Sequence, residues 1–558
     1  MLISCFEKPN TRWQSGFHCT LILFLLSACS SSEPNVVTGN QTGVLHYGTG
    51  AEVQTLDPHI VQDINAWEIS GALFEGLVRR NAETLEAEPG VAESWNFSED
   101  QLTITFKLNP TARWSNGDPV TAEDFVWSWQ RSLNPAMGNV LAGTLFPIKN
   151  AEPYNRGEID DPEQLGVKAM NRHTLKVTLK NPTPHILGSL AAPAAYPVHR
   201  ETVEKYGTAT QRYSQWTRPD NIVNNGPFKL ADWKLYRHLR VERNESYWDA
   251  ENVALNAIMF RPIEDQTAEE RMFRARQLHV TFQVPINKIP EYRALPQTPY
   301  VQAPLLGSYY YLFNITQPVV NDINVRKALS MALDRERLVS KVLLGVERPS
   351  ASIVPPGIPG YQTQNHAYFD PEKARQLLAA SGYPDGKGWP GLELLYNTAE
   401  NHRRVAVAMQ QMWKDNLNIE VTLVNQEWKV YLDTVDNKQF SLARMGWTGN
   451  SLDPEDFLAK FTTGGGTNRT GFSNTRYDEI VEHLAPAATT LEERYKLMAE
   501  AETLFMQEFA LIPIFSYNGR HLVQPSVKGY HPNVLEIRNF KNMSLDASAP
   551  VWAWPAEY

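Results

Sequence analysis

The chain has 558 residues, of which 42% are hydrophobic and 20% are charged, and its formal net charge is −10. This length exceeds what one hydrophobic core can organise, and the composition excludes disordered and fibrous classes. The acidic balance argues against nucleic acid as a partner.

The N-terminal segment has the pattern of an export signal. Lys8 and Arg12 precede a short apolar run at residues 21–26, and small residues then lead to Cys29. The sequence LSAC at residues 26–29 resembles the lipobox of bacterial lipoproteins, which implies cleavage after residue 28 and lipidation of Cys29. We therefore expect a signal peptide at 1–28, a lipid-anchored tether at 29–43, and a location in the periplasm or cell envelope.

The first predicted strand, from Val44 to Tyr47, is followed by a connection that carries a glutamate. Pro58 favours an extended loop over residues 52–65, so Glu52 lies on a loop and can face a cleft. A solvated Glu52 is the alternative.

Residues 89–131 carry the most specific local pattern. Residues 102–108 alternate as a strand, Asn116-Gly117 makes a turn, and Thr121 with Asp124 predicts a capped helix start. The blocks AESW, W-NG-PVTA-DF and SW-R in this region are similar to the signature of the family 5 solute-binding proteins of ABC importers. The resemblance continues over roughly residues 44 to 530, through EVQTLDPH, LFEGL, NNGPFKLADW, YYYLFN, LLYNT, LVNQEW and AR-GWTG.

Helices and strands alternate in the second half of the chain. Asp370-Pro371 opens a helix that ends near Gly382, residues 402–414 have one apolar face, and residues 419–424 follow as a strand. Thr490 and Glu493 open a long helix to residue 509, with a β-rich run at 511–517 behind it. This order predicts two-layer α/β lobes.

The stretch at residues 440–457 combines a strand with a turn. At period 2, Arg444 and Gly446 face one side of the strand while Met445 and Trp447 face the other. A guanidinium beside a glycine can accept an anion and leaves room for a ligand main chain. An ordinary strand with a solvated arginine is the alternative reading.

The resemblance implies a two-lobed α/β periplasmic-binding-protein fold of three domains with mixed sheets and a ligand cleft between the lobes. Its expected boundaries are 44–63, 192–305 and 517–558 for a discontinuous domain I, 64–191 for an inserted domain II, and 306–516 for domain III. Strands near 300 and 516 would serve as hinges.

The resemblance also implies the residues that hold a peptide. Arg444 and His402 match positions that meet the peptide carboxylate, Trp428 and Trp447 match aromatic walls, Gly446 matches a main-chain contact, and Glu52 matches a cleft-lining residue. Core roles for the two tryptophans and a solvated His402 are the alternatives.

One position departs from the family. Where the oligopeptide binders carry an aspartate that pairs with the α-ammonium of the ligand, this chain has Asn450, which offers no counter-charge. Asp453 or Glu52 could supply the charge, or the ligand could lack a free amino terminus. Val435 stands where some relatives carry an arginine.

These patterns favour a monomeric lipoprotein that captures oligopeptides and delivers them to ABC permease subunits. A binder of a murein-derived, modified or non-peptide solute, and a sensing protein with the same fold, are the alternatives. We expect no enzyme activity, because the sequence contains no HExxH, Walker loop or Cys/His cluster. No cofactor or metal is expected, and the membrane is a partner only through the lipid anchor.

Overall fold

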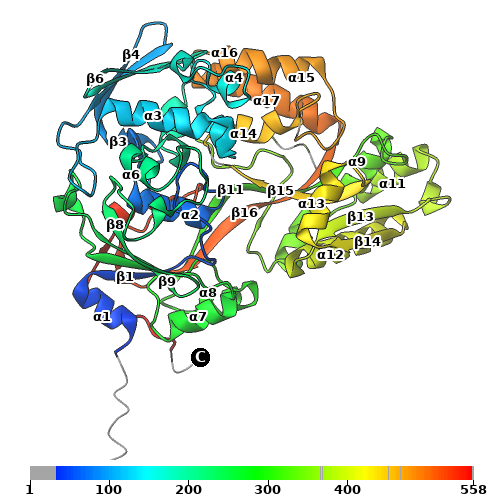
Figure 1. Cartoon of the computed structure of the whole chain (residues 1–558). Coiled ribbons are helices and arrows are strands. Elements are labelled where there is room, and N and C mark those ends of the chain that lie inside the picture. Colours follow the sequence, from blue (N-terminus) through cyan, green and yellow to red (C-terminus); the bar gives the residue numbers. More distant parts are fainter. Residues whose placement is uncertain (1–32, 365, 367, 450, 466, 556–558) are drawn as a thin grey trace, which may run out of the picture.

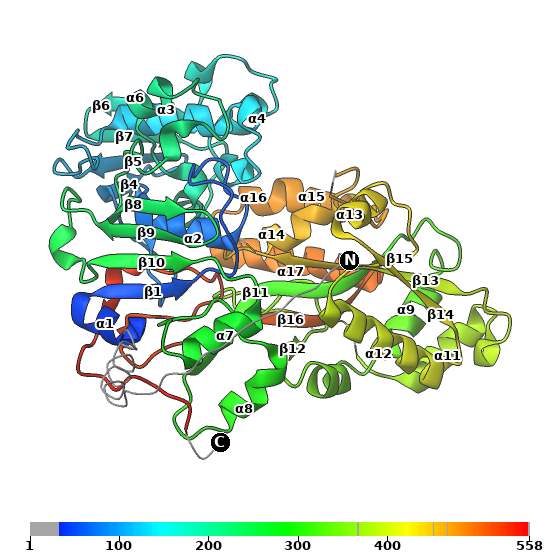
Figure 2. The same cartoon turned by 60° about the horizontal axis from the view of Figure 1, so that its bottom comes forward.

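The computed structural model describes residues 33–364, 366, 368–449, 451–465 and 467–555. Figure 1 shows a large body that contains the first half of the chain and, in this view, helices α14 to α17, and a projecting arm built on β13 and β14, with β11, β15 and β16 running between them. Figure 2 shows the same arrangement from a second side. The chain therefore forms lobes joined by long strands.

Two four-stranded sheets and two small ones organise the body. The first sheet has the order β1 (Val44–Gly48), β10 (Ala257–Arg261), β9 (His238–Arg243) and β8 (Phe228–Lys234). The second has the order β4 (Ala92–Phe97), β5 (Thr103–Leu108), β7 (Thr174–Thr178) and β6 (Val167–Asn171). The short pairs are β2 (Val78–Arg80) with β3 (Ala87–Pro89), and β17 (Val527–Lys528) with β18 (Ser544–Leu545).

The second half of the chain is built on a six-stranded mixed sheet. Its order is β12 (Arg348–Pro349), β16 (Leu511–Leu522), β11 (Tyr300–Phe313), β15 (Leu442–Thr448), β13 (Leu392–Asn397) and β14 (Val421–Gln426). Strand β13 pairs in parallel with both β14 and β15, whereas β11 is antiparallel to β15 and β16. The hinge positions expected near 300 and 516 fall within β11 and β16, the two longest strands of this sheet.

Helices cover these sheets. Those of the first half are α1 (Asn35–Thr42), α2 (Ile64–Leu73), α3 (Ala122–Leu133), α4 (Ala151–Asn155), α5 (Ile186–Leu190), α6 (Arg200–Lys205), α7 (Gln266–Arg274) and α8 (Ile289–Arg293). Those of the second half are α9 (Ile323–Met331), α10 (Arg335–Arg337), α11 (Pro371–Ala380), α12 (Glu400–Leu417), α13 (Trp428–Asp436), α14 (Glu455–Leu458), α15 (Thr475–Glu479), α16 (Ala485–Ala487) and α17 (Leu491–Gln507).

Local capping explains where the predicted helices begin. Thr121 and Asp124 form the capping box of α3, Asp370 accepts a hydrogen bond from the backbone N–H of Lys373 at the start of α11, and Thr490 caps α17. These predicted helix starts are confirmed, because each depends only on residues within one turn.

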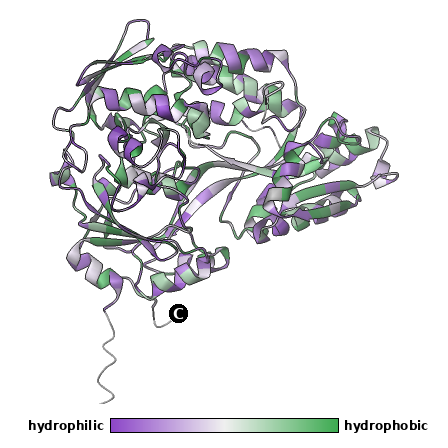
Figure 3. Cartoon of the chain, viewed as in Figure 1, coloured by the Kyte–Doolittle hydropathy of each residue, from purple (hydrophilic) through white to green (hydrophobic). Residues whose placement is uncertain are grey.

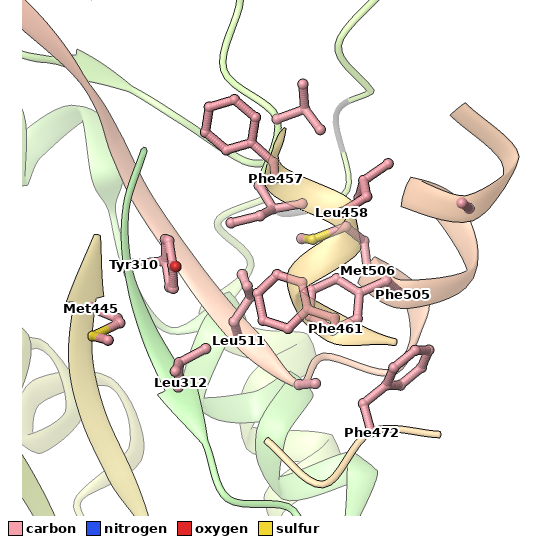
Figure 4. Close-up of a cluster of buried hydrophobic side chains, with 14 of the residues drawn as sticks. Tyr310, Leu312, Met445, Phe457, Leu458, Phe461, Phe472, Phe505, Met506 and Leu511 are labelled. Carbon is pink, nitrogen blue, oxygen red and sulfur yellow. The ribbon is translucent and has the colours of Figure 1, made fainter. Parts of the chain in front are cut away.

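Two hydrophobic cores lie on opposite faces of the six-stranded sheet. The α17-side core combines Tyr310 and Met445 of the sheet with side chains from α14 and α17, among them Phe457 and Phe505, as Figure 4 shows. The α12-side core combines Tyr309 and Leu442 with side chains from α9, α11 and α12. Figure 3 shows hydrophobic strands β13 and β14 beneath helices of mixed character, as burial of one helix face requires.

The expected tether at 29–43 is wrong for its second half. Residues 35–42 form α1, whose Val36, Gly39 and Asn40 are buried against the body. His279 Nε2 lies 3.1 Å from Asn40 Oδ1, and the space beside Gly39 is filled by the His279 ring. The partner that fixes α1 is distant in sequence, so the local composition did not reveal it. Within the described residues, no helix combines the length and the apolar character needed to cross a membrane.

Candidate functional site

Three of the predicted site residues, His402, Trp428 and Arg444, lie near the carboxyl ends of the parallel strands β13 and β14. Strand β13 ends at Asn397, just before α12 and its His402, and β14 ends at Gln426, just before α13, which begins at Trp428. Carboxyl ends of parallel strands meet at one sheet edge, where α/β proteins bind ligands. The amino ends of α12 and α13 favour negative charge at this edge.

Arg444 is buried at this edge on β15 and has no anionic partner among the described residues. Its Nη2 donates to the hydroxyl of Tyr517 at 2.9 Å, and its Nη1 donates to Asn397 Oδ1 at 3.4 Å. Its guanidinium carbon lies 4.6 Å from the ring centroid of Tyr309. Among the described residues no carboxylate lies within salt-bridge distance of it, and its Nε–H has no acceptor. A guanidinium only 9% exposed and held by neutral groups is suited to pair with an anionic ligand.

His402 joins the same group through Tyr309. Its Nδ1 lies 3.3 Å from the Tyr309 hydroxyl. Burial, and then the positive charge of Arg444, lower the pKa of His402 to about 3. The imidazole is therefore neutral at pH 7 in the unliganded protein, and a carboxylate bound beside it would favour its protonation.

Gly446 is required by packing within the protein. A Cβ at this position would lie 2.7 Å from the Tyr517 hydroxyl and 3.2 Å from both Arg444 Nη2 and the Ser308 carbonyl oxygen. The space that the sequence reasoning gave to a ligand main chain is thus occupied by the Tyr517–Arg444 contact.

Strand alternation separates the tryptophan of β15 from its arginine. Trp447 packs against the α17-side core, whereas Arg444 contacts Tyr309 of the α12-side core, so the two side chains lie on opposite faces of the sheet. The ammonium of Lys460 lies 3.0 Å from the Trp447 ring centroid, and burial lowers the pKa of Lys460 to about 8. Trp447 is therefore in contact with a cation of its own domain.

Trp428 remains accessible and is connected to Arg444. It is 48% exposed and stacks on Tyr431 with 5.9 Å between ring centroids. The Tyr431 hydroxyl in turn donates to the backbone carbonyl of Arg444. The exposed indole suits an aromatic wall of a binding surface, and its link to Arg444 runs through Tyr431 of the α17-side core to the backbone of Arg444.

Asp453 is held by an internal ion pair. Arg494 Nε and Nη2 donate to its two carboxylate oxygens at 2.7 and 3.0 Å, and both side chains are buried. Burial alone would raise the pKa of Asp453, but the nearby His185 and Arg494 outweigh it and hold this pKa below its ordinary value. The hypothesis that Asp453 is available to a ligand ammonium is therefore corrected, because its charge already neutralises Arg494.

Glu52 lies in the first lobe, where its carboxylate is also engaged. Its Oε1 accepts a hydrogen bond from Trp233 Nε1 at 2.9 Å, and its Oε2 accepts one from the backbone N–H of Tyr236. The residue fixes the β8–β9 turn to the loop after β1. Asn450 and Cys29 lie outside the described residues.

Three residues that sequence reasoning did not single out complete the Arg444 group: Asn397, Tyr309 and Tyr517. Asn397 and Tyr309 fall in the blocks LLYNT and YYYLFN, but nothing in the sequence indicates that their side chains turn toward position 444. Their strand positions at the same sheet edge as β15 are the signal that the topology adds.

The fold and the site define a two-lobed α/β ligand-binding protein. The chain belongs to the bacterial extracellular solute-binding proteins, family 5, since the family profile (family 5 Middle) matches residues 86–469.

Its relatives agree over nearly the whole length. The periplasmic oligopeptide-binding protein OppA of Salmonella typhimurium is 34% identical over 523 residues, which are 91% of this chain and 94% of that protein. The periplasmic murein peptide-binding protein MppA of Escherichia coli is 34% identical over 92% of this chain and 95% of its own.

Solved structures show the same architecture. Haemophilus influenzae OppA in complex with RPPGFSPFR matches with a TM-score of 0.75 and 32% identity, over 90% of this chain and 99% of that chain. The Escherichia coli murein tripeptide binding protein MppA matches with a TM-score of 0.75 and 33% identity, over 90% and 98%. The predicted periplasmic-binding-protein fold is confirmed.

Proposed function

We propose that this protein captures oligopeptides outside the cytoplasm and delivers them to the membrane subunits of an ABC importer. The observation that carries the proposal is the buried Arg444 guanidinium, which has only neutral partners among the described residues. A peptide carboxylate would supply the missing negative charge and would accept hydrogen bonds from the N–H groups that Arg444 does not use within the protein. The names of OppA and MppA, which are similar over more than nine-tenths of the chain, support peptide as the ligand class.

Binding rather than chemistry is the proposed activity. The ligand main chain would lie along the strand ends, with closure of the lobes removing it from water and the transporter reopening them. The protein would act as a monomer without cofactor, and catalysis forms no part of the proposal.

Tryptophan fluorescence titration with fractions of a random peptide pool tests the proposal, since Trp428 is exposed at the start of α13, next to the end of β14. We expect a saturable change with at least one fraction of free-carboxylate peptides. No response from any fraction would refute peptide capture.

A second candidate is a peptide without a free α-ammonium, such as a murein-derived or modified peptide. Asn450 stands where the resembling binders have an aspartate, Asp453 is committed to Arg494, and Glu52 is bound to Trp233. Mass spectrometry of the ligand retained on purification decides between the two. A ladder of ordinary free peptides would refute the second candidate, and blocked or murein peptides would support it.

We also propose export and lipidation at Cys29, with residues 1–28 removed. The support is the charged start, short apolar run and LSAC sequence. Fatty-acid labelling should mark the wild type and fail to mark Cys29→Ser, and equal labelling of both would refute the anchor.

A further inference from the structure

A separate cavity of about 90 Å³ lies within the first lobe, between α2 and the segment at residues 535–541. Aromatic and aliphatic side chains, including Trp67, Tyr196 and Leu535, form much of its wall. A single water needs roughly 10–15 Å³ by this kind of measure, so the cavity has room for a small organic molecule. None of the residues considered for the Arg444 site lines it.

One guanidinium on this wall is buried without a carboxylate. Arg80 is only 9% exposed, and its Nη2 donates to the Gly188 carbonyl oxygen at 2.7 Å. The described part of the chain contains no carboxylate within salt-bridge distance of Arg80. A Cβ at position 188 would lie 2.8 Å from Arg80 Nη2, so the absence of a side chain at Gly188 leaves the space that this guanidinium occupies. Burial lowers the pKa of Arg80 to about 10, which still leaves it charged at pH 7.

The other basic residues of the wall have their own partners. Arg79 pairs with Glu88 at 3.1 Å and with Glu75, a carboxylate of the same wall, at 3.4 Å. Arg538 pairs with Glu536, and Lys541 pairs with an aspartate outside the cavity. Burial raises the pKa of Glu68, a further wall residue, to about 8, against the opposing effect of Arg538, so at pH 7 Glu68 does not offer a full negative charge. Among the described residues, Arg80 is therefore the basic residue of the wall that has no carboxylate within salt-bridge distance, and Asp456 acts on it only from further away.

Gly71 leaves part of the space open. Its Cβ position has the Tyr196 hydroxyl at 4.0 Å and no other atom within that distance among the described residues. A Cβ added there would meet no clash.

We propose that this cavity is a second binding site, for a small organic acid whose carboxylate pairs with Arg80 and whose apolar body contacts Trp67 and Tyr196. Such an amphipathic anion matches both the positive charge of Arg80 and the apolar wall. Chloride would match only the charge, and a neutral apolar molecule would match only the apolar wall. Two sources share this chemistry: a free acid, and the carboxyl group of a bound peptide. The proposal stands apart from peptide capture at Arg444.

Isothermal titration of the purified full chain with benzoate, and then with hexanoate, tests the site. We expect saturable one-to-one binding of at least one acid, weakened by at least about 30-fold in Arg80→Met, because one partner of a buried charge pair is lost. Gly71→Leu should abolish binding by filling the space while improving helix propensity in α2. This second variant keeps the test decisive if Arg80→Met does not fold.

Matched controls separate this site from the other. Arg200→Gln removes an exposed arginine of the same half of the chain and should bind benzoate like the wild type. The benzoate titration uses no peptide, so a failure of peptide capture would not affect this result. Displacement of benzoate by a saturating peptide would identify the peptide carboxyl group as the source, and no displacement would identify a free acid. No saturable heat in the wild type with either acid, or equal affinity in Arg80→Met, would overturn the proposal.

Discussion

Replacing Arg444 with methionine should separate ligand binding from stability. The substitution removes a ring contact with Tyr309 worth about 0.5–2 kcal/mol. It also removes a buried charge that has no anionic partner among the described residues, and burying such a charge costs several kcal/mol. We therefore expect the free energy of unfolding of the unliganded protein to stay the same or to rise.

Peptide binding should respond in the opposite direction. Loss of one partner of a buried, hydrogen-bonded charge pair costs about 2–5 kcal/mol, so the affinity for a free-carboxylate tripeptide should fall by at least about 30-fold. The assay is isothermal titration with the tripeptide and with its carboxyl-terminal amide. Wild type should prefer the acid, and Arg444→Met should lose that preference.

Arg326→Met is the matched control. Arg326 is a buried arginine of the same domain that donates to the carbonyl oxygens of Glu508 and Val320. Its loss should lower stability and leave the preference for the acid intact. If Arg444→Met weakens acid and amide equally, the assignment of the guanidinium to a ligand carboxylate is refuted.

Three further substitutions or conditions test the surrounding structure. Gly446→Ala should destabilise the fold by about 1–3 kcal/mol in chemical denaturation, because its Cβ would displace the Tyr517 hydroxyl; an unchanged midpoint contradicts this packing. Asp453→Asn should cost about 1.5–3 kcal/mol of stability, because Arg494 loses its charged hydrogen bonds to Asp453 but keeps the ion pair with Glu455; a mutant of normal stability with impaired peptide binding would restore Asp453 as a ligand residue. Burial, with a contribution from a neighbouring histidine, lowers the pKa of His279 to about 3, so the folded state binds fewer protons than the unfolded state and stability is lost as pH falls from 6.5 toward 3. Hydrogen exchange of α1 should accordingly accelerate over that pH range in the wild type, and exchange independent of pH after correction for intrinsic rates would contradict the role of His279.

Local signals in the sequence were enough to predict some of the elements that carry the site, among them β15 and α12, whereas β13 and α13 were not predicted as elements. The caps at Thr121, Asp370 and Thr490 act within one helical turn, and alternation along 442–448 correctly assigned Arg444 and Trp447 to opposite faces. Both patterns depend only on neighbours in the chain, which is why they could be read without coordinates.

The predictions that the structure changed concern residues whose partners are brought to them by the fold. Asp453 forms an ion pair with Arg494 of α17, which is 41 residues further along the chain. Helix α1 is fixed by His279, which is 239 residues from Asn40. The hydroxyl of Tyr517, on β16, fills the space at Gly446 on β15, although β11 lies between these two strands. Residue type indicates which groups need a partner, but the topology decides which partner arrives.

The most direct test of the account is a crystal structure of the protein with a bound free-carboxylate tripeptide. We predict that the peptide lies at the carboxyl ends of β13, β14 and β15, with its terminal carboxylate within hydrogen-bond distance of Arg444 or His402. A tripeptide bound elsewhere, or one whose carboxylate contacts neither residue, would contradict the account.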